Sequence, residues 1–140
     1  GEWDLDWNDR LNTSTPRRVK GEWIFSWVLD GMAVQDVFIV PSRAERLTDI
    51  QPDAAYGTTI RLFNIERQVW EIFYGCPEEC ARLEARKEGD EIILTEITSK
   101  AMKWIFSDIT DNSFTWRSIA KSPAGDWITL ARVYATRKKK

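Results

Sequence analysis

Apolar and polar residues alternate with a period of two along most of this chain, a pattern typical of half-buried β-strands. Short groups of Gly, Asp, Asn and Pro interrupt the alternation, for example at Asp30-Gly31 and Glu88-Gly89-Asp90, and such groups favour tight turns. The pattern predicts about ten strands, near residues 2–8, 21–29, 32–40, 57–63, 68–75, 80–87, 90–97, 101–108, 113–120 and 126–136.

Turns rather than helices separate these strands, which indicates antiparallel hairpins. A parallel crossover needs about a dozen residues, usually helical, and only the stretch 41–55 has room for even a short helix. We therefore predict one all-β domain over residues 1–140, folded as an antiparallel up-and-down barrel of about 8–10 strands. Closure into a barrel would also remove the exposed edges of an open sheet.

The turn at Asp30-Gly31 predicts a cross-strand register. With a two-residue turn, four pairs share one face: Leu29 with Met32, Trp27 with Val34, Phe25 with Asp36, and Trp23 with Phe38. This face is the bulkier of the two and is expected to point inward. Asp36 would then be a single carboxylate among aromatic rings.

A buried carboxylate at Asp36 needs a partner or must be neutral. One interpretation is structural, with Asp36 satisfied by an arginine or by tryptophan N–H groups. The other is functional. Arg61 and Arg132 are the candidate arginine partners. Arg61 shares one face of its strand with Thr59 and Phe63 while Ile60 and Leu62 share the other, so its direction is left open.

Other strands place large residues on one face each. The sets expected to point inward are Trp70, Ile72 and Tyr74; Met102, Trp104 and Phe106; and Phe114, Trp116 and Ser118. Each of these residues alone is most simply a core residue, because large side chains fill small barrels. Taken together, so many large inward residues favour a cavity.

The composition of the chain excludes several classes of functional site. The 140 residues contain 8 Trp and no His, which excludes imidazole-based triads, proximal-histidine haem sites and the common zinc sites. We expect neither metal nor cofactor. A net charge of −2 argues against nucleic-acid binding, and the basic residues at 137–140 are expected to form a tail. Without an apolar run of about 18 residues, we expect a soluble chain that does not enter membranes.

The two cysteines, Cys76 and Cys80, lie four positions apart in GCPEEC. This spacing differs from that of a Cys-x-x-Cys redox motif, and two sulfurs without His do not make a structural zinc site. We expect two free thiols in a cytoplasmic protein, while a short-loop disulfide in an exported protein stays open.

The segments GEWIFSW, GMAVQDVFIVPSR, YGTTIRLFN, QVWEIFYG and KWIFSDITDNSFTWRS together resemble bacterial lipocalin-like proteins of the calycin superfamily. The resemblance extends from about residue 23 to residue 137 and implies a calycin-type barrel. Trp3 in the opening GEW is similar to the tryptophan of the Gly-x-Trp that closes the base of lipocalin barrels.

The last strand, ITLARVYATRKKK, resembles the closing strand of intracellular fatty-acid and retinoid-binding proteins. That resemblance implies that Arg132 and Tyr134 face the interior and hold a ligand carboxylate, because an arginine fork suits a carboxylate. The segment 9–20 departs from those proteins, since it is too short and too polar for their helical lid.

Three functions remain open. The first is binding of a small apolar or aromatic molecule, which could bear a carboxylate; the second is a cofactor-free isomerase or cyclase with Asp36 or Tyr74 as acid or base; the third is a structural or interaction domain with a filled core. A homodimer is also left open. The candidate ligand-binding residues are Phe25, Trp27, Asp36, Arg61, Trp70, Tyr74, Trp104, Trp116, Arg132 and Tyr134.

Overall fold

A computed structural model of the protein describes residues 1–46, 54–98 and 100–139. The helix found in these residues, α1, is too short to cross a membrane. The elements are β1 (Glu2–Asp9), β2 (Arg17–Val28), β3 (Ala33–Val40), α1 (Arg43–Arg46), β4 (Ala55–Asn64), β5 (Val69–Gly75), β6 (Cys80–Glu88), β7 (Glu91–Glu96), β8 (Met102–Ser107), β9 (Ser113–Lys121) and β10 (Trp127–Arg137).

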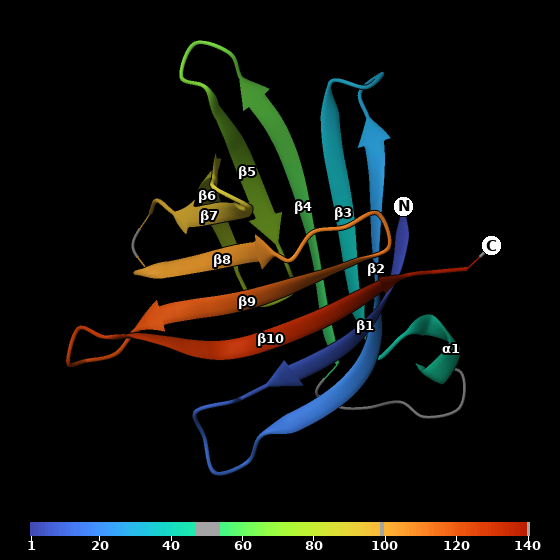
Figure 1. Ribbon diagram of the computed structural model, residues 1–140, viewed down its shortest axis with the longest axis vertical. Helices are drawn as coiled ribbons and strands as arrows, with labels where there is room; N and C mark the ends of the chain where they lie inside the picture. The colour runs from blue at the N-terminus through green and yellow to red at the C-terminus, as the bar shows by residue number, and fades with distance from the viewer. Residues whose placement is uncertain (47–53, 99, 140) are drawn as a thin grey trace.

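The ten strands form a closed antiparallel barrel in which each strand pairs with its neighbours in the chain (Figure 1). The barrel closes where β1 pairs with β10, from Trp3 opposite Arg137 to Asn8 opposite Arg132. The prediction of an all-β up-and-down barrel is confirmed, and the architecture is consistent with a calycin-like barrel.

All ten predicted strands are present, and the largest difference is at the start of β2. This strand begins at Arg17 rather than near residue 21, because β1 and β2 continue to pair as far as Asp9 opposite Arg17. The guanidinium of Arg18 also binds the Asp6 carboxylate on β1 at 2.7 Å. The segment 9–20 is therefore a hairpin turn and the start of a strand. In the stretch 41–55, α1 occupies 43–46, and residues 47–53 lie outside the described residues.

The register predicted for β2 and β3 is confirmed, with Phe25 opposite Asp36 and Trp23 opposite Phe38. The main chain at Asp30 and Gly31 has φ values of 55° and 82°, as a tight hairpin turn requires, and the Met32 N–H donates to the Leu29 carbonyl.

The core is an aromatic cluster inside the barrel, centred on Trp23. Its ring centroid lies 5.1–5.9 Å from those of five others: Phe25, Phe38, Phe106, Phe114 and Trp116. Such tilted and edge-to-face contacts add to the free energy gained from burying the rings.

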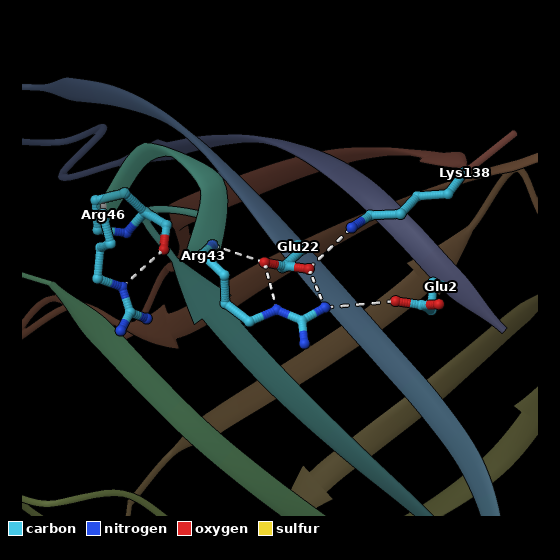
Figure 2. Close-up of polar contacts among 6 residues, drawn as sticks. Glu2, Glu22, Arg43, Arg46 and Lys138 are labelled. Atoms are coloured by element: carbon cyan, nitrogen blue, oxygen red, sulfur yellow. Dashed lines mark hydrogen bonds and ion pairs between the residues drawn. The ribbon is translucent and has the colours of Figure 1, made fainter. Parts of the chain in front are cut away.

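On the outer wall, Glu22 of β2 fastens α1 to the barrel (Figure 2). Its side chain is 3% exposed. It accepts hydrogen bonds from the Arg43 main-chain N–H, Nε and Nη2 at 2.7, 3.0 and 2.8 Å, and from Lys138 Nζ at 2.8 Å. The bonds from Arg43 are the largest influence on this carboxyl, and together with Lys138 they lower the pKa of Glu22 to about 2 despite its burial.

The C-terminal residues differ from the predicted basic tail. Arg137 is the last residue of β10; it stacks 4.3 Å above the Trp3 ring, and its Nε donates to the Asp111 carbonyl. Lys138 binds Glu22. These two side chains are held because strand closure pairs β10 with β1, whose other neighbour is β2. Lys140 lies outside the described residues.

We predict that Glu22→Gln lowers the free energy of unfolding by about 2 kcal/mol at neutral pH, since a lowered carboxyl pKa stabilises the fold wherever the unfolded chain is also ionised. The loss should be full above pH 4.5, the ordinary pKa, and should shrink as pH falls toward 2. Urea unfolding at several pH values measures it. Glu91→Gln, which removes a more exposed ion pair with Arg117, should have a smaller effect, and a loss from Glu22→Gln independent of pH would contradict the assignment.

Candidate functional site: the barrel interior

The barrel interior contains two cavities, one toward each end. The first, which we call the apolar chamber, has a volume of about 420 Å³, and the second, the mixed chamber, about 280 Å³. Apolar side chains dominate the first, including Trp3, Phe25, Val34, Trp70, Ile72, Leu94, Phe106 and Phe114. The second combines aromatic and polar groups, including Trp7, Trp23, Asp36, Phe38, Thr59, Tyr74, Trp104, Trp116 and Ser118.

Arg61 of β4 lines both chambers. Its guanidinium lies 5.2 Å from the centre of the Phe25 ring and 5.6 Å from that of Phe106, within cation–π distance of both. The direction of Arg61, which the alternation on β4 left open, is inward.

Asp36 of β3 is the ionic partner of Arg61. Arg61 Nη2 lies 2.7 Å from Asp36 Oδ2, and the two side chains are 14% and 2% exposed. Thr59, opposite Asp36 in the sheet, donates to the same carboxylate from its main-chain N–H at 3.2 Å and from Oγ1 at 2.7 Å. The expectation that an arginine satisfies the Asp36 carboxylate is therefore confirmed, and Arg61 is that arginine.

Burial is the largest influence on the Asp36 carboxyl and raises its pKa, while Arg61 and then the Thr59 hydroxyl act in the opposite direction. The indole N–H of Trp23 also favours the ionised carboxylate, although it is buried without a partner that meets hydrogen-bond geometry. Both oxygens of Asp36 are engaged, so in this arrangement Asp36 holds Arg61 in position and is poorly placed to accept a proton from a substrate.

The ion pair leaves most of the guanidinium uncommitted. An arginine carries five N–H donors, and Asp36 is the one polar partner of Arg61 among the described residues. Because the side chain lines both cavities, its remaining donors are available to a molecule in either chamber. The interior thus offers a fixed positive group between apolar walls.

Tyr74 of β5 brings a hydroxyl to the mixed chamber. Its ring packs edge-on against Trp104 with 4.9 Å between centroids, and burial, the largest influence, raises its pKa, so the phenol stays protonated at neutral pH. Gly57 makes room for this ring: a Cβ there would lie 2.8 Å from the Tyr74 ring. Tyr74 can act as a hydrogen-bond donor but not as a base at neutral pH.

Seven of the ten candidate residues lie on the walls of these chambers. Phe25, Arg61 and Trp70 line the apolar chamber, and Asp36, Arg61, Tyr74, Trp104 and Trp116 line the mixed chamber. The predicted inward faces of β5, β8 and β9 are thereby confirmed.

Trp27 is differently placed: its side chain is 71% exposed. It has the same parity on β2 as Trp23 and Phe25, but the end of the β2–β3 hairpin extends beyond the body of the barrel (Figure 1). The expected burial of Trp27 in the pocket is wrong because no opposing wall of the described chain covers it there.

Arg132 and Tyr134 point outward, so their expected orientation is also wrong. The register between β9 and β10 shifts between Thr129 and Ala131, which indicates a β-bulge. The extra residue reverses the alternation, so Ala131 and Val133 are buried while Tyr134 is 49% exposed. The resemblance of this strand to fatty-acid-binding proteins therefore does not extend to an inward Arg-x-Tyr pair.

Three residues that shape the interior site were not among the candidate residues: Thr59, Gly57 and Trp23. Thr59 precedes Arg61 by two positions, so once Arg61 faces inward the alternation places Thr59 beside it. Gly57 lies two positions before Thr59 and so has the same inward parity on β4. Trp23 was expected on the inner face but not as a contact of Asp36.

Cys76 and Cys80 are free, the first half-buried and the second exposed. In the described part of the chain, no group of three or more Cys, Asp and Glu side chains is arranged to hold a metal ion.

The described residues form a ten-stranded antiparallel barrel whose divided interior contains the buried ion pair Arg61–Asp36. No protein-family model matches the chain, and no curated protein matches it.

We predict that Asp36→Ala lowers the free energy of unfolding by about 3–5 kcal/mol, because it leaves the buried Arg61 charge uncompensated. The double variant Asp36→Leu/Arg61→Met should recover most of this loss, since it removes both charges. Asp6→Ala is the matched control, because the carboxylate of Asp6 and the guanidinium of Arg18 are also 2.7 Å apart but lie at the surface, 33% and 74% exposed. This variant should have a much smaller effect. Denaturant unfolding measures all three, and equal losses in the single and double variants would contradict the pairing.

Proposed function

We propose that this protein binds a small, largely apolar or aromatic molecule inside the barrel, with Arg61 as the anchor for an anionic or carbonyl group of that molecule. The observation that carries the proposal is the buried guanidinium with donors to spare between two cavities. A cation in such a place is costly, and a single carboxylate satisfies only part of its donor capacity.

The apolar chamber has a suitable size and surface for a small molecule. Small-molecule sites are commonly cavities of roughly 300–1,000 Å³, mostly apolar with a few polar groups that fix orientation. The apolar chamber, at about 420 Å³, lies within that range. Unfilled space on both sides of the ion pair also disfavours the hypothesis of a structural domain with a filled core.

The surroundings of Arg61 favour an acceptor on the ligand. Phe25 and Phe106 limit the access of water to the guanidinium, and hydrogen bonds to a charged group gain strength where water is excluded. Tyr74 and Trp23 add two further donors in the mixed chamber. The enzyme hypothesis has less support, since both oxygens of Asp36 are engaged and a protonated Tyr74 leaves only the role of an acid.

The test compares two fluorescent probes with the same ring system, 1-anilinonaphthalene-8-sulfonate and the uncharged N-phenyl-1-naphthylamine. We expect Asp36→Leu/Arg61→Met to bind the sulfonate at least about tenfold more weakly and the neutral probe as tightly as before, because a charge-assisted hydrogen bond is lost. Arg132→Met removes an outward cation, and Trp27→Ser controls for dye bound outside the barrel; neither should change the ratio of the two affinities.

An unchanged ratio in the double variant, or absence of binding by both probes to the wild-type protein, would overturn the proposal. Native mass spectrometry of freshly purified protein gives a second readout, in which a co-purified small molecule should be released on unfolding.

A further inference from the structure

The mouth of the apolar chamber carries a group of large, exposed apolar side chains. Figure 1 shows the β2–β3 and β4–β5 hairpins extending past the other strands. The end residues of these two hairpins are strongly exposed: Trp27 71%, Leu29 62%, Met32 74%, Phe63 42% and Ile65 76%. We call these five residues the mouth surface.

This surface is continuous with the chamber. Phe63 packs on Trp70 with 5.2 Å between ring centroids, and Trp70 lines the chamber. Trp27 pairs with Val34, which also lines it. Two further lining residues, Ile92 and Ile109, are 37% and 49% exposed at the ends of other strands. A molecule within the chamber would leave the side chains on the projecting hairpins uncovered, so their occupant must be wider than the chamber.

Each of the four turns at this end contains at least one acidic residue. The turns at 29–32, 65–68, 89–90 and 108–112 contain five exposed carboxylates: Asp30, Glu66, Asp90, Asp108 and Asp111. Their one basic residue, Arg67, lies 3.4 Å from Glu71 and 2.6 Å from Glu84 and is neutralised by them. Leu29 is followed by Asp30, Ile65 by Glu66, and Ile109 is preceded by Asp108, so each apolar tip has an acidic neighbour.

We propose that the mouth surface docks a basic amphipathic segment of a partner protein, whose apolar side covers the five residues and whose Lys and Arg side chains meet the surrounding carboxylates. Complementary charge raises the association rate and excludes wrong partners, and an amphipathic helix on an apolar surface is a common recognition mode. A second copy docked mouth to mouth would bring the acidic turns together, and an anionic membrane would be repelled.

The test uses two synthetic amphipathic helical peptides with the same leucine pattern, one with lysine and one with glutamate on the polar side. We expect the full chain to bind the Leu/Lys peptide with an affinity that falls as salt is added, and to bind the Leu/Glu peptide at least about tenfold more weakly. Calorimetric titration gives both affinities.

Two variants locate the binding. Trp27→Ser/Met32→Ser should weaken the Leu/Lys peptide at least about tenfold, and Asp30→Asn/Asp108→Asn should reduce its salt dependence. Trp127→Ser is the matched control: Trp127 is 41% exposed at the other end of the barrel, beside Lys103 and Lys121, and its loss should leave the affinity unchanged. All substituted side chains are exposed, and thermal melts verify that each variant folds.

Three outcomes would overturn the proposal. Equal binding of the two peptides would show unspecific adhesion. Dimerisation of the wild type that Trp27→Ser/Met32→Ser abolishes, measured by analytical ultracentrifugation, would assign the mouth surface to a second copy. Binding to phosphatidylcholine vesicles lost in the same variant would assign it to a lipid surface. None of these variants changes Arg61 or Asp36, so the result is independent of ligand binding in the interior.

Discussion

A charge placed in a water-poor interior must be compensated by nearby groups, and much of this barrel's interior is organised around that requirement. Arg61 and Asp36 lie on adjacent strands, with 2.7 Å between Arg61 Nη2 and Asp36 Oδ2. The Thr59 hydroxyl donates a further hydrogen bond to the carboxylate, and the rings of Phe25 and Phe106 flank the guanidinium. Replacing such a pair by apolar side chains is often neutral or stabilising, so a buried pair is weak evidence of a contribution to stability. Its place between two cavities is the observation on which the proposed binding function rests.

The outer wall meets a similar requirement in a different way. Glu22 is nearly as buried as Asp36, yet its partners Arg43 and Lys138 are on the surface, so the carboxyl stays ionised with a pKa of about 2. Inside, burial is the largest influence on Asp36 and raises its pKa. The outer pair thus fastens α1 and the C-terminal strand to β2, whereas the inner pair maintains a polar group in an apolar space.

Most of the fold could be predicted from the sequence, because a strand period of two, with turn residues at regular intervals, is a strong local signal. The same signal predicted the register that brings Asp36 to the aromatic face. Three features depended on long-range structure. Arg61 could not be oriented because both faces of β4 carry apolar residues; a bulge in β10 reversed Arg132 and Tyr134; and Trp27 was exposed because strand length does not reveal where an opposing wall ends.

Because Arg61 borders both chambers, the two cavities share one set of donors. An acceptor group in one chamber that engages these donors leaves fewer of them for the other chamber, and the affinity of a molecule in either cavity then depends on whether the other is occupied. Thermodynamic linkage makes this dependence reciprocal: whatever free energy the first occupant adds to or removes from the binding of the second, the second imposes equally on the first. Under the proposed function, a barrel with one polar partition would be a two-site receptor whose sites compete for a single residue.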